Sequence, residues 1–298
     1  MRELLIGVIL LLASFAFDFF PTHSTAIVIL YASTFCLSLF YIYDGIIILV
    51  KGTSYMRGRY RKVIRHILLV GIIAGVATEA IGNWLYKFWI YPHFSSYFYL
   101  LVVPISLCLY FFLLFENYIA IHVVLEKFFP SPKIVVKRKK LHTIAFSIIG
   151  FLGIATFSFV TCSKLLAYKV PSNILNIFNT YWLSSNDVVN LFMLCISIWF
   201  IFEYLEYQRR EDTLLLHIFK GDFTAFLSII VASLITSVVM EIFNLPIKIW
   251  IYTNVPYYNI VFLGVPIVVL FLWPFQYLLF DCFYHFIYKK ETEAIWTE

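Results

Sequence analysis

The chain has 298 residues, of which 62% are apolar and 13% charged, with a formal net charge of +5. Its mean hydropathy is +0.89. Soluble domains contain about 25% charged residues and disordered chains have low hydrophobicity, so this composition excludes both classes. Continuous apolar runs recur along the chain and favour helices over the alternating pattern of a transmembrane β-barrel. We therefore expect an all-α, polytopic integral membrane protein.

The apolar runs predict eight transmembrane helices in chain order. Arg2 and the apolar run after it have the layout of a signal peptide, but no small-residue cleavage site follows, so we expect this first helix to be retained. The runs lie at about residues 3–20, 24–50, 63–85, 97–125, 141–163, 184–206, 221–245 and 257–288.

Basic residues between these runs predict the orientation. Six Lys or Arg lie in residues 51–66 and six more in 127–140, and altogether 18 of the 22 basic residues fall on one side of the predicted bundle. Because positive loops stay in the cytoplasm, we expect a multi-pass protein of the inner or plasma membrane with both termini cytoplasmic. The bilayer is thus an expected partner, whereas nucleic acid is not.

The sequence contains an internal repeat with a shift of 161–162 residues. Each copy has an acid followed by an amide, then Trp-Ile-Tyr, then Val-Pro-Ile. Four predicted spans per copy imply two parallel four-helix repeats related by an axis along the membrane normal. The predicted units are a first repeat at 1–130, a basic cytoplasmic linker at 131–140, a second repeat at 141–290 and a cytoplasmic tail at 291–298.

Carboxyl groups within or beside the apolar runs are candidates for chemistry. Ionisable groups at membrane depth are costly and usually face a bundle interior, where burial favours the protonated form that a proton donor requires. Seven of the 17 acids have this position: Asp44, Glu79, Glu116, Glu203, Glu206, Glu241 and Asp281.

Two of these acids, Glu79 and Glu241, are matched across the repeat and share a helix face with Asn83 and Asn244 respectively. One interpretation is that acid and amide hydrogen-bond to each other and hold helices together. The other is an active centre between the halves. Asp44 and Glu206 are closer to the cytoplasmic end, where we expect snorkelling or pairing with loop arginines.

Four aromatic residues follow the two acids at matched spacing. Trp89 and Tyr91 follow Glu79, and Trp250 and Tyr252 follow Glu241. Such residues are typical of the aromatic belt at a membrane interface. Beside a proton donor, their ring faces can also stabilise a carbocation.

Metal and cofactor sites are not indicated. Asp281 and His285 share a helix face, but no further His or Cys follows at ligand spacing. The five cysteines form no Cys-x-x-Cys motif. No nucleotide-binding or haem-attachment motif is present, so we expect neither a metal nor a cofactor.

The repeated motif resembles the repeat unit of the membrane-integral lycopene cyclase domain family, and Thr78–Gly82 is similar to the acid-Gly segment of membrane carotenoid hydratases. The resemblance implies a carotenoid substrate, catalytic acids at Glu79 and Glu241, and substrate contacts from Asn83, Asn244 and the four aromatic residues. The matching residues are Glu79, Trp89, Tyr91, Pro104 and Phe111, then Glu241, Trp250, Tyr252 and Pro266.

One feature of that family is missing from this chain. The cyclases follow the proline with two glutamates, whereas Pro104 and Pro266 are followed here by Ile-Ser-Leu and Ile-Val-Val. The hypothesis is therefore cyclisation or hydration of an isoprenoid end group by Glu79, Glu241 or both. The alternatives are a proton- or cation-coupled transporter and a non-catalytic, lipid-binding membrane subunit.

Overall fold

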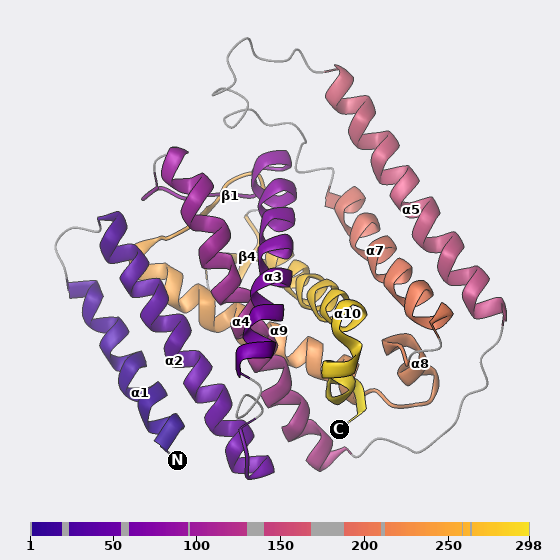
Figure 1. Ribbon diagram of the computed structural model, residues 1–298. Helices are drawn as coiled ribbons and strands as arrows, with labels where there is room; N and C mark the ends of the chain where they lie inside the picture. The colour runs from indigo at the N-terminus through magenta and orange to yellow at the C-terminus, as the bar shows by residue number, and fades with distance from the viewer. Residues whose placement is uncertain are drawn as a thin grey trace.

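The structure is a computed structural model, and it describes residues 2–19, 24–54, 60–94, 96–129, 140–167, 188–209, 212–257, 259–262 and 264–297. These residues are mostly helical (Figure 1). The helices are α1 (Arg2–Phe15), α2 (Thr25–Lys51), α3 (Tyr60–Thr78), α4 (Ser96–Phe128), α5 (Lys140–Ala167), α7 (Val188–Gln208), α8 (Leu214–Phe219), α9 (Thr224–Ile247) and α10 (Ile267–Thr297). A 3-10 turn follows α1 (Ala16–Phe19) and a π-helix, η2 (Glu79–Leu85), follows α3; the strands are β1 (Trp89–Ile90), β2 (Ile251–Tyr252), β3 (Val261–Phe262) and β4 (Val265–Pro266).

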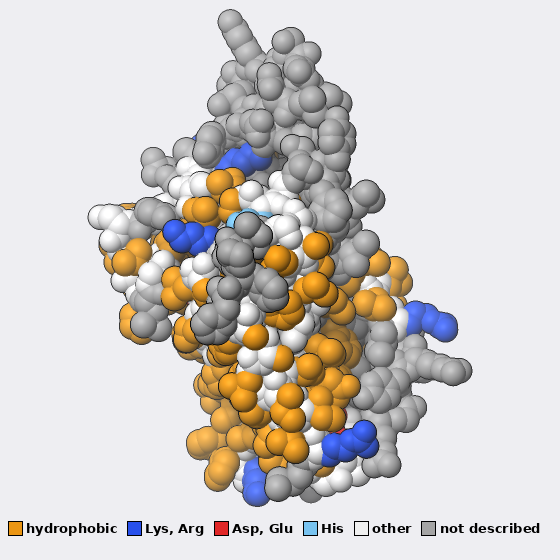
Figure 2. All heavy atoms as spheres, turned by 90° about the vertical axis from the view of Figure 1, so that its left-hand side faces the viewer, with side chains coloured by type: hydrophobic (Ala, Val, Ile, Leu, Met, Phe, Trp, Pro, Cys, Tyr) orange, Lys and Arg blue, Asp and Glu red, His pale blue; other side chains and the backbone are white. Residues whose placement is uncertain are grey.

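The chain is a helical membrane-spanning protein. Within the described ranges, six helices are long and apolar enough to cross a membrane, namely α2, α5, α7, α9 and most of α4 and α10. Helix α1 has 14 residues, and the apolar part of α3 is shorter than these six. Apolar side chains cover the face formed by α1 and α2 (Figure 2), and such a wide exposed apolar surface suits contact with lipid.

The helices form one bundle, and a pair of neighbouring helices lies at each of two edges. Helices α1 and α2 lie side by side at one edge and α5 and α7 at the other, with α4, α9 and α10 between them (Figure 1). Stacked rings hold the centre together: Phe35 of α2 and Phe243 of α9 have centroids 3.8 Å apart, and Phe111 of α4 and Phe280 of α10 are 4.7 Å apart. Both ends of the chain lie at the same end of the bundle.

Glycine allows the same close helix contact at both edges. A Cβ atom on Gly7 of α1 would lie 2.7 Å from Ile42 and 2.8 Å from the backbone oxygen of Ser38 on α2. On α5, a Cβ on Gly150 would lie 2.6 Å from Ile201 and 3.2 Å from the backbone oxygen of Ser197 on α7. Small residues at such positions let helix backbones approach each other in lipid.

Two predicted spans differ from the structure. The expected helix at 257–288 begins only at Ile267, because Tyr257 and Gly264 have positive φ values and the strands β3 and β4 precede it. The expected helix at 63–85 is α-helical only to Thr78 and continues as η2. Most of the linker expected at 131–140 lies outside the described residues, and α10 continues through the expected tail to Thr297 with a kink at Tyr288.

Candidate functional site

Two equivalent turns lie where the acid-containing helices end. Lys87 follows η2 with φ = 56° and Lys248 follows α9 with φ = 54°. Such left-handed backbone is uncommon for residues other than glycine, and the two lysines are 161 residues apart, as are the Trp-Ile-Tyr segments that follow them.

Those segments pair with each other. Strand β1 runs antiparallel to β2, with Trp89 opposite Tyr252 and Ile90 opposite Ile251. Trp89 thus faces Tyr252, the counterpart of Tyr91, and Ile90 faces its own counterpart, Ile251. This is the pairing that a two-fold axis between the strands produces.

A one-residue difference between the turns is absorbed in η2. Eight positions separate Glu79 from Lys87, whereas seven separate Glu241 from Lys248. A π turn contains one more residue than an α turn, so the π-helical form of η2 accommodates the additional residue. Glu79 is the first residue of that segment.

Each acid accepts a hydrogen bond from the tyrosine that follows it in the sequence. The Tyr91 hydroxyl donates to Glu79 Oε1 at 2.7 Å, and the Tyr252 hydroxyl donates to Glu241 Oε1. The tryptophans differ. Trp89 Nε1 donates to Glu79 Oε1 at 3.3 Å, while Trp250 Nε1 donates to the Tyr252 hydroxyl at 3.2 Å.

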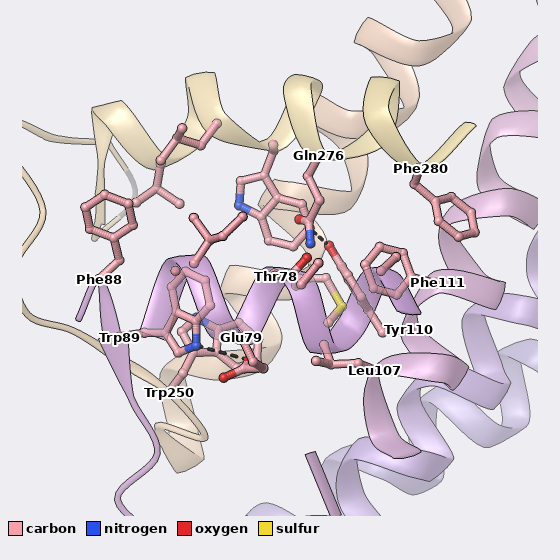
Figure 3. A pocket seen from close by; sticks show the side chains of 18 of the residues that line it. Thr78, Glu79, Phe88, Trp89, Leu107, Tyr110, Phe111, Trp250, Gln276 and Phe280 are labelled. Carbon is pink, nitrogen blue, oxygen red and sulfur yellow. Dashed lines mark hydrogen bonds between the residues drawn. The ribbon is translucent and has the colours of Figure 1, made fainter. Parts of the chain in front are cut away.

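A cavity of about 500 Å³ lies beside these groups, and side chains of α2, α4, α7, α9 and α10 help to line it. Figure 3 shows Glu79 and the tryptophans toward one end of it and Phe111 and Phe280 toward the other. Between them, the Tyr110 hydroxyl donates to Gln276 Oε1 at 3.1 Å. Five predicted site residues line the cavity, namely Glu79, Trp89, Tyr91, Trp250 and Tyr252.

The other three predicted site residues are not among those that line it. Glu241 accepts a hydrogen bond from Tyr252, which does line the cavity. The Asn244 amide donates to the Trp250 carbonyl and accepts from the Trp250 N–H, each at 3.0 Å, so it holds the turn before β2. Asn83 is buried, and its backbone carbonyl accepts a hydrogen bond from the backbone N–H of Lys87 at 3.1 Å.

All seven acids selected from the sequence are buried, which confirms that they face the bundle interior. Glu206 contacts His285 at 2.8 Å, and Asp44 accepts a hydrogen bond from Ser54 at 2.5 Å. For these two acids we expected snorkelling or pairing with loop arginines; Arg57, Arg59 and Arg210 lie outside the described residues, so that expectation stays a prediction. In the part of the chain that the structure describes, no group of three or more His, Cys, Asp or Glu residues has the geometry of a metal site.

Lys87 is a member of the site that sequence reasoning missed. Its side chain is buried, 7% exposed, and lies within electrostatic range of Glu79. Burial lowers the pKa of its ammonium group from the ordinary 10.5, and the charge of Glu79 opposes this shift. The sequence signal was available, since each copy has a lysine two positions before Trp-Ile-Tyr. Its counterpart Lys248 is exposed.

Comparisons of the chain with models of known protein families, with curated proteins and with solved structures found no match.

We expect Lys87→Met to remove a pH dependence of stability that Lys248→Met keeps. Below its lowered folded pKa, Lys87 is protonated in both states. Between that pKa and 10.5 only the unfolded chain binds the proton, so stability rises with pH across this window. The measurement is the thermal unfolding midpoint in detergent at a series of alkaline pH values. An equal rise in Lys87→Met and wild type would contradict burial of this charge.

Proposed function

We propose that the protein is a membrane enzyme that protonates the end group of a long apolar isoprenoid of the carotenoid class and so initiates cyclisation or hydration. The observation that carries this proposal is the position of the Glu79 carboxyl group in the wall of a predominantly apolar cavity. The cavity volume lies within the range of about 300–1,000 Å³ for small-molecule sites, and its apolar wall suits a hydrocarbon substrate.

The hydrogen bonds on Glu79 indicate which oxygen carries the proton. Trp89 and Tyr91 both donate to Oε1, so a proton on this carboxyl group belongs on Oε2. Transfer of that proton to one carbon of an end-group double bond leaves a carbocation and a carboxylate. Aromatic faces that line the cavity, among them Trp250, then stabilise the cation by cation–π contact.

Two outcomes follow from this cation, and both regenerate the acid. In cyclisation, a second double bond of the same molecule attacks the cation, and a neighbouring carbon returns a proton to the carboxylate. In hydration, water attacks the cation and its surplus proton returns to the carboxylate. Neither route consumes an oxidant or a reductant, so the proposal includes no redox cofactor.

Glu241 and Lys87 have supporting roles in this proposal. Glu241 acts through Tyr252, which donates a hydrogen bond to it and lines the cavity. The Lys87 ammonium group lies within electrostatic range of Glu79, and its positive charge stabilises the Glu79 carboxylate that remains after proton transfer. The two acids therefore have unequal roles although the repeat matches them.

We also propose that the chain is a duplication with eight transmembrane helices, four in each half, and with both termini in the cytoplasm. Support comes from the equivalent turns at Lys87 and Lys248, the pairing of β1 with β2 and the glycine contacts at both edges of the bundle. The distribution of basic residues supports the orientation.

The test is expression in a bacterial host that accumulates lycopene, with chromatography of the pigments. We expect a product that cells with an empty vector lack. An unchanged pigment profile from protein that is shown to be inserted in the membrane would contradict activity on lycopene.

The buried acids also favour a second candidate, a proton-coupled transporter, because such groups are typical of ion pathways in membranes. Purified protein in liposomes with an internal pH-sensitive dye distinguishes the two. Transport predicts proton flux that Glu79→Gln abolishes, whereas the proposed enzyme converts pigment without net flux.

A further inference from the structure

Asp281 is a buried acid that the proposed reaction does not use. It lies on α10 with 0% of its surface exposed, and neither carboxyl oxygen has a hydrogen-bond partner. Among the described residues, Tyr118 of α4 and Tyr277 and Cys282 of α10 are ionisable groups within electrostatic range of Asp281. Cys282 is also within electrostatic range of Glu203 and Glu206 of α7. A carboxyl group without partners is costly in such a place, so packing gives no reason for its presence.

One turn further toward the C-terminus, α10 presents His285 on the same face. His285 Nδ1 lies 2.8 Å from Glu206 Oε1 of α7, and both side chains are buried. Glu206 is two residues before Gln208, where α7 ends. Arg209, at the end of α7, donates to the Phe286 carbonyl at 3.0 Å, so the pair lies close to a charged edge of the molecule.

One turn in the other direction, Tyr277 lies on the same face of α10 as Asp281 and is hydrogen-bonded in the core of the bundle. Its hydroxyl donates to Thr236 Oγ1 of α9 at 2.6 Å and accepts from the Asn117 amide of α4 at 3.0 Å. The residue before it, Gln276, is bound to Tyr110, and both line the apolar cavity. The polar side chains of His285, Asp281 and Tyr277 thus follow one face of α10 from the charged edge, and Gln276, next to Tyr277 in the sequence, lines the cavity.

We propose that this line, His285–Asp281–Tyr277, carries protons between the charged edge at Arg209 and the central cavity. Its members are four residues apart, a rise of about 6 Å along the helix per step, which one bridging water can span. At each step a proton leaves one oxygen or nitrogen and joins the next, so the net change is proton movement alone. The proposal does not depend on the reaction in the cavity.

The test is infrared spectroscopy of the full-length protein in lipid, because a protonated carboxyl group has a carbonyl band distinct from that of a carboxylate. We expect Asp281→Asn to remove one such band. In wild type, that band is expected to shift soon after transfer to D₂O, since the line connects Asp281 with bulk solvent. His285→Gln is expected to keep the band and to lose the rapid shift.

Glu116→Gln is the matched control, because Glu116 of α4 is also fully buried without hydrogen-bond partners but lies within electrostatic range of Asp44 rather than on the line. It should remove a different band and leave the exchange of the Asp281 band unchanged. If Asp281→Asn does not fold, His285→Gln tests the same exchange with Asp281 in place, and Tyr277→Phe, on the cavity side of Asp281, should leave that exchange unchanged. A protonated band unaffected by Asp281→Asn, or equally rapid exchange in His285→Gln, would overturn the proposal.

Discussion

Glu79→Gln is expected to lower pigment conversion by about 10²–10⁴-fold, the usual contribution of a positioned acid or base. Gln keeps the shape of the side chain and an oxygen that accepts from Trp89 and Tyr91, but it has no proton to transfer to an alkene. Because the polar contacts survive, the variant should insert and unfold like wild type. The measurement is product per amount of membrane-inserted protein, together with the thermal midpoint in detergent.

Glu241→Gln is the matched control for this prediction. Glu241 has the same tyrosine contact but is not among the residues that line the cavity, so its loss should reduce conversion less than the loss of Glu79. Partial recovery in Glu79→Asp would support proton transfer over packing. Conversion at the wild-type level in folded Glu79→Gln would refute Glu79 as the acid.

Gly82→Ala is expected to destabilise the protein by about 1–3 kcal/mol, the cost typical of overpacking. A Cβ atom on Gly82 would lie 1.9 Å from Cη2, 2.5 Å from Cζ3 and 2.8 Å from Cζ2 of Trp89. The indole must move, and with it the hydrogen bond to Glu79 and the pairing of β1 with β2. Thermal unfolding in detergent and pigment conversion should both report the change.

Two further variants make this prediction specific. Gly71→Ala on α3 is the control, since its nearest contact would be 3.2 Å away on α4, and we expect a smaller loss. The three clashing atoms all belong to the six-membered ring of the indole, which Trp89→Phe shortens. Gly82→Ala combined with Trp89→Phe should therefore cost less than the sum of the single changes. Strict additivity would show that the indole is not the obstacle.

The helix content was predictable from sequence because a chain in lipid must satisfy its backbone hydrogen bonds internally. This argument weakens at helix ends. The apolar segment 257–266 reads as the start of a helix, yet the turns at Tyr257 and Gly264 and the β3–β4 pair lie there. Apolar composition indicates that a segment avoids water, but it does not distinguish a helix from a short hairpin.

For the acids, too, one property was predictable from the sequence and another was not. Their burial was predictable because charge is scarce in the apolar runs and costly there. Which of the matched acids lines the cavity was not predictable. One additional residue rotates the side chains that follow it by about 100° around the helix axis. The first copy has such an additional residue between Glu79 and Lys87, and it lies in the π-helix η2.

By itself, the sequence determined that this is a helical membrane protein, where most of its helices lie, and which acids and aromatic residues recur at matched spacing. Only the tertiary structure decided that Trp89 and Tyr91 meet on one oxygen of Glu79, that Lys87 is buried beside it, and that Asp281 lies without partners in the core. Apolar composition indicates which segments avoid water. The direction of a side chain depends on helix rotation and on packing between segments more than 150 residues apart, as for β1 and β2.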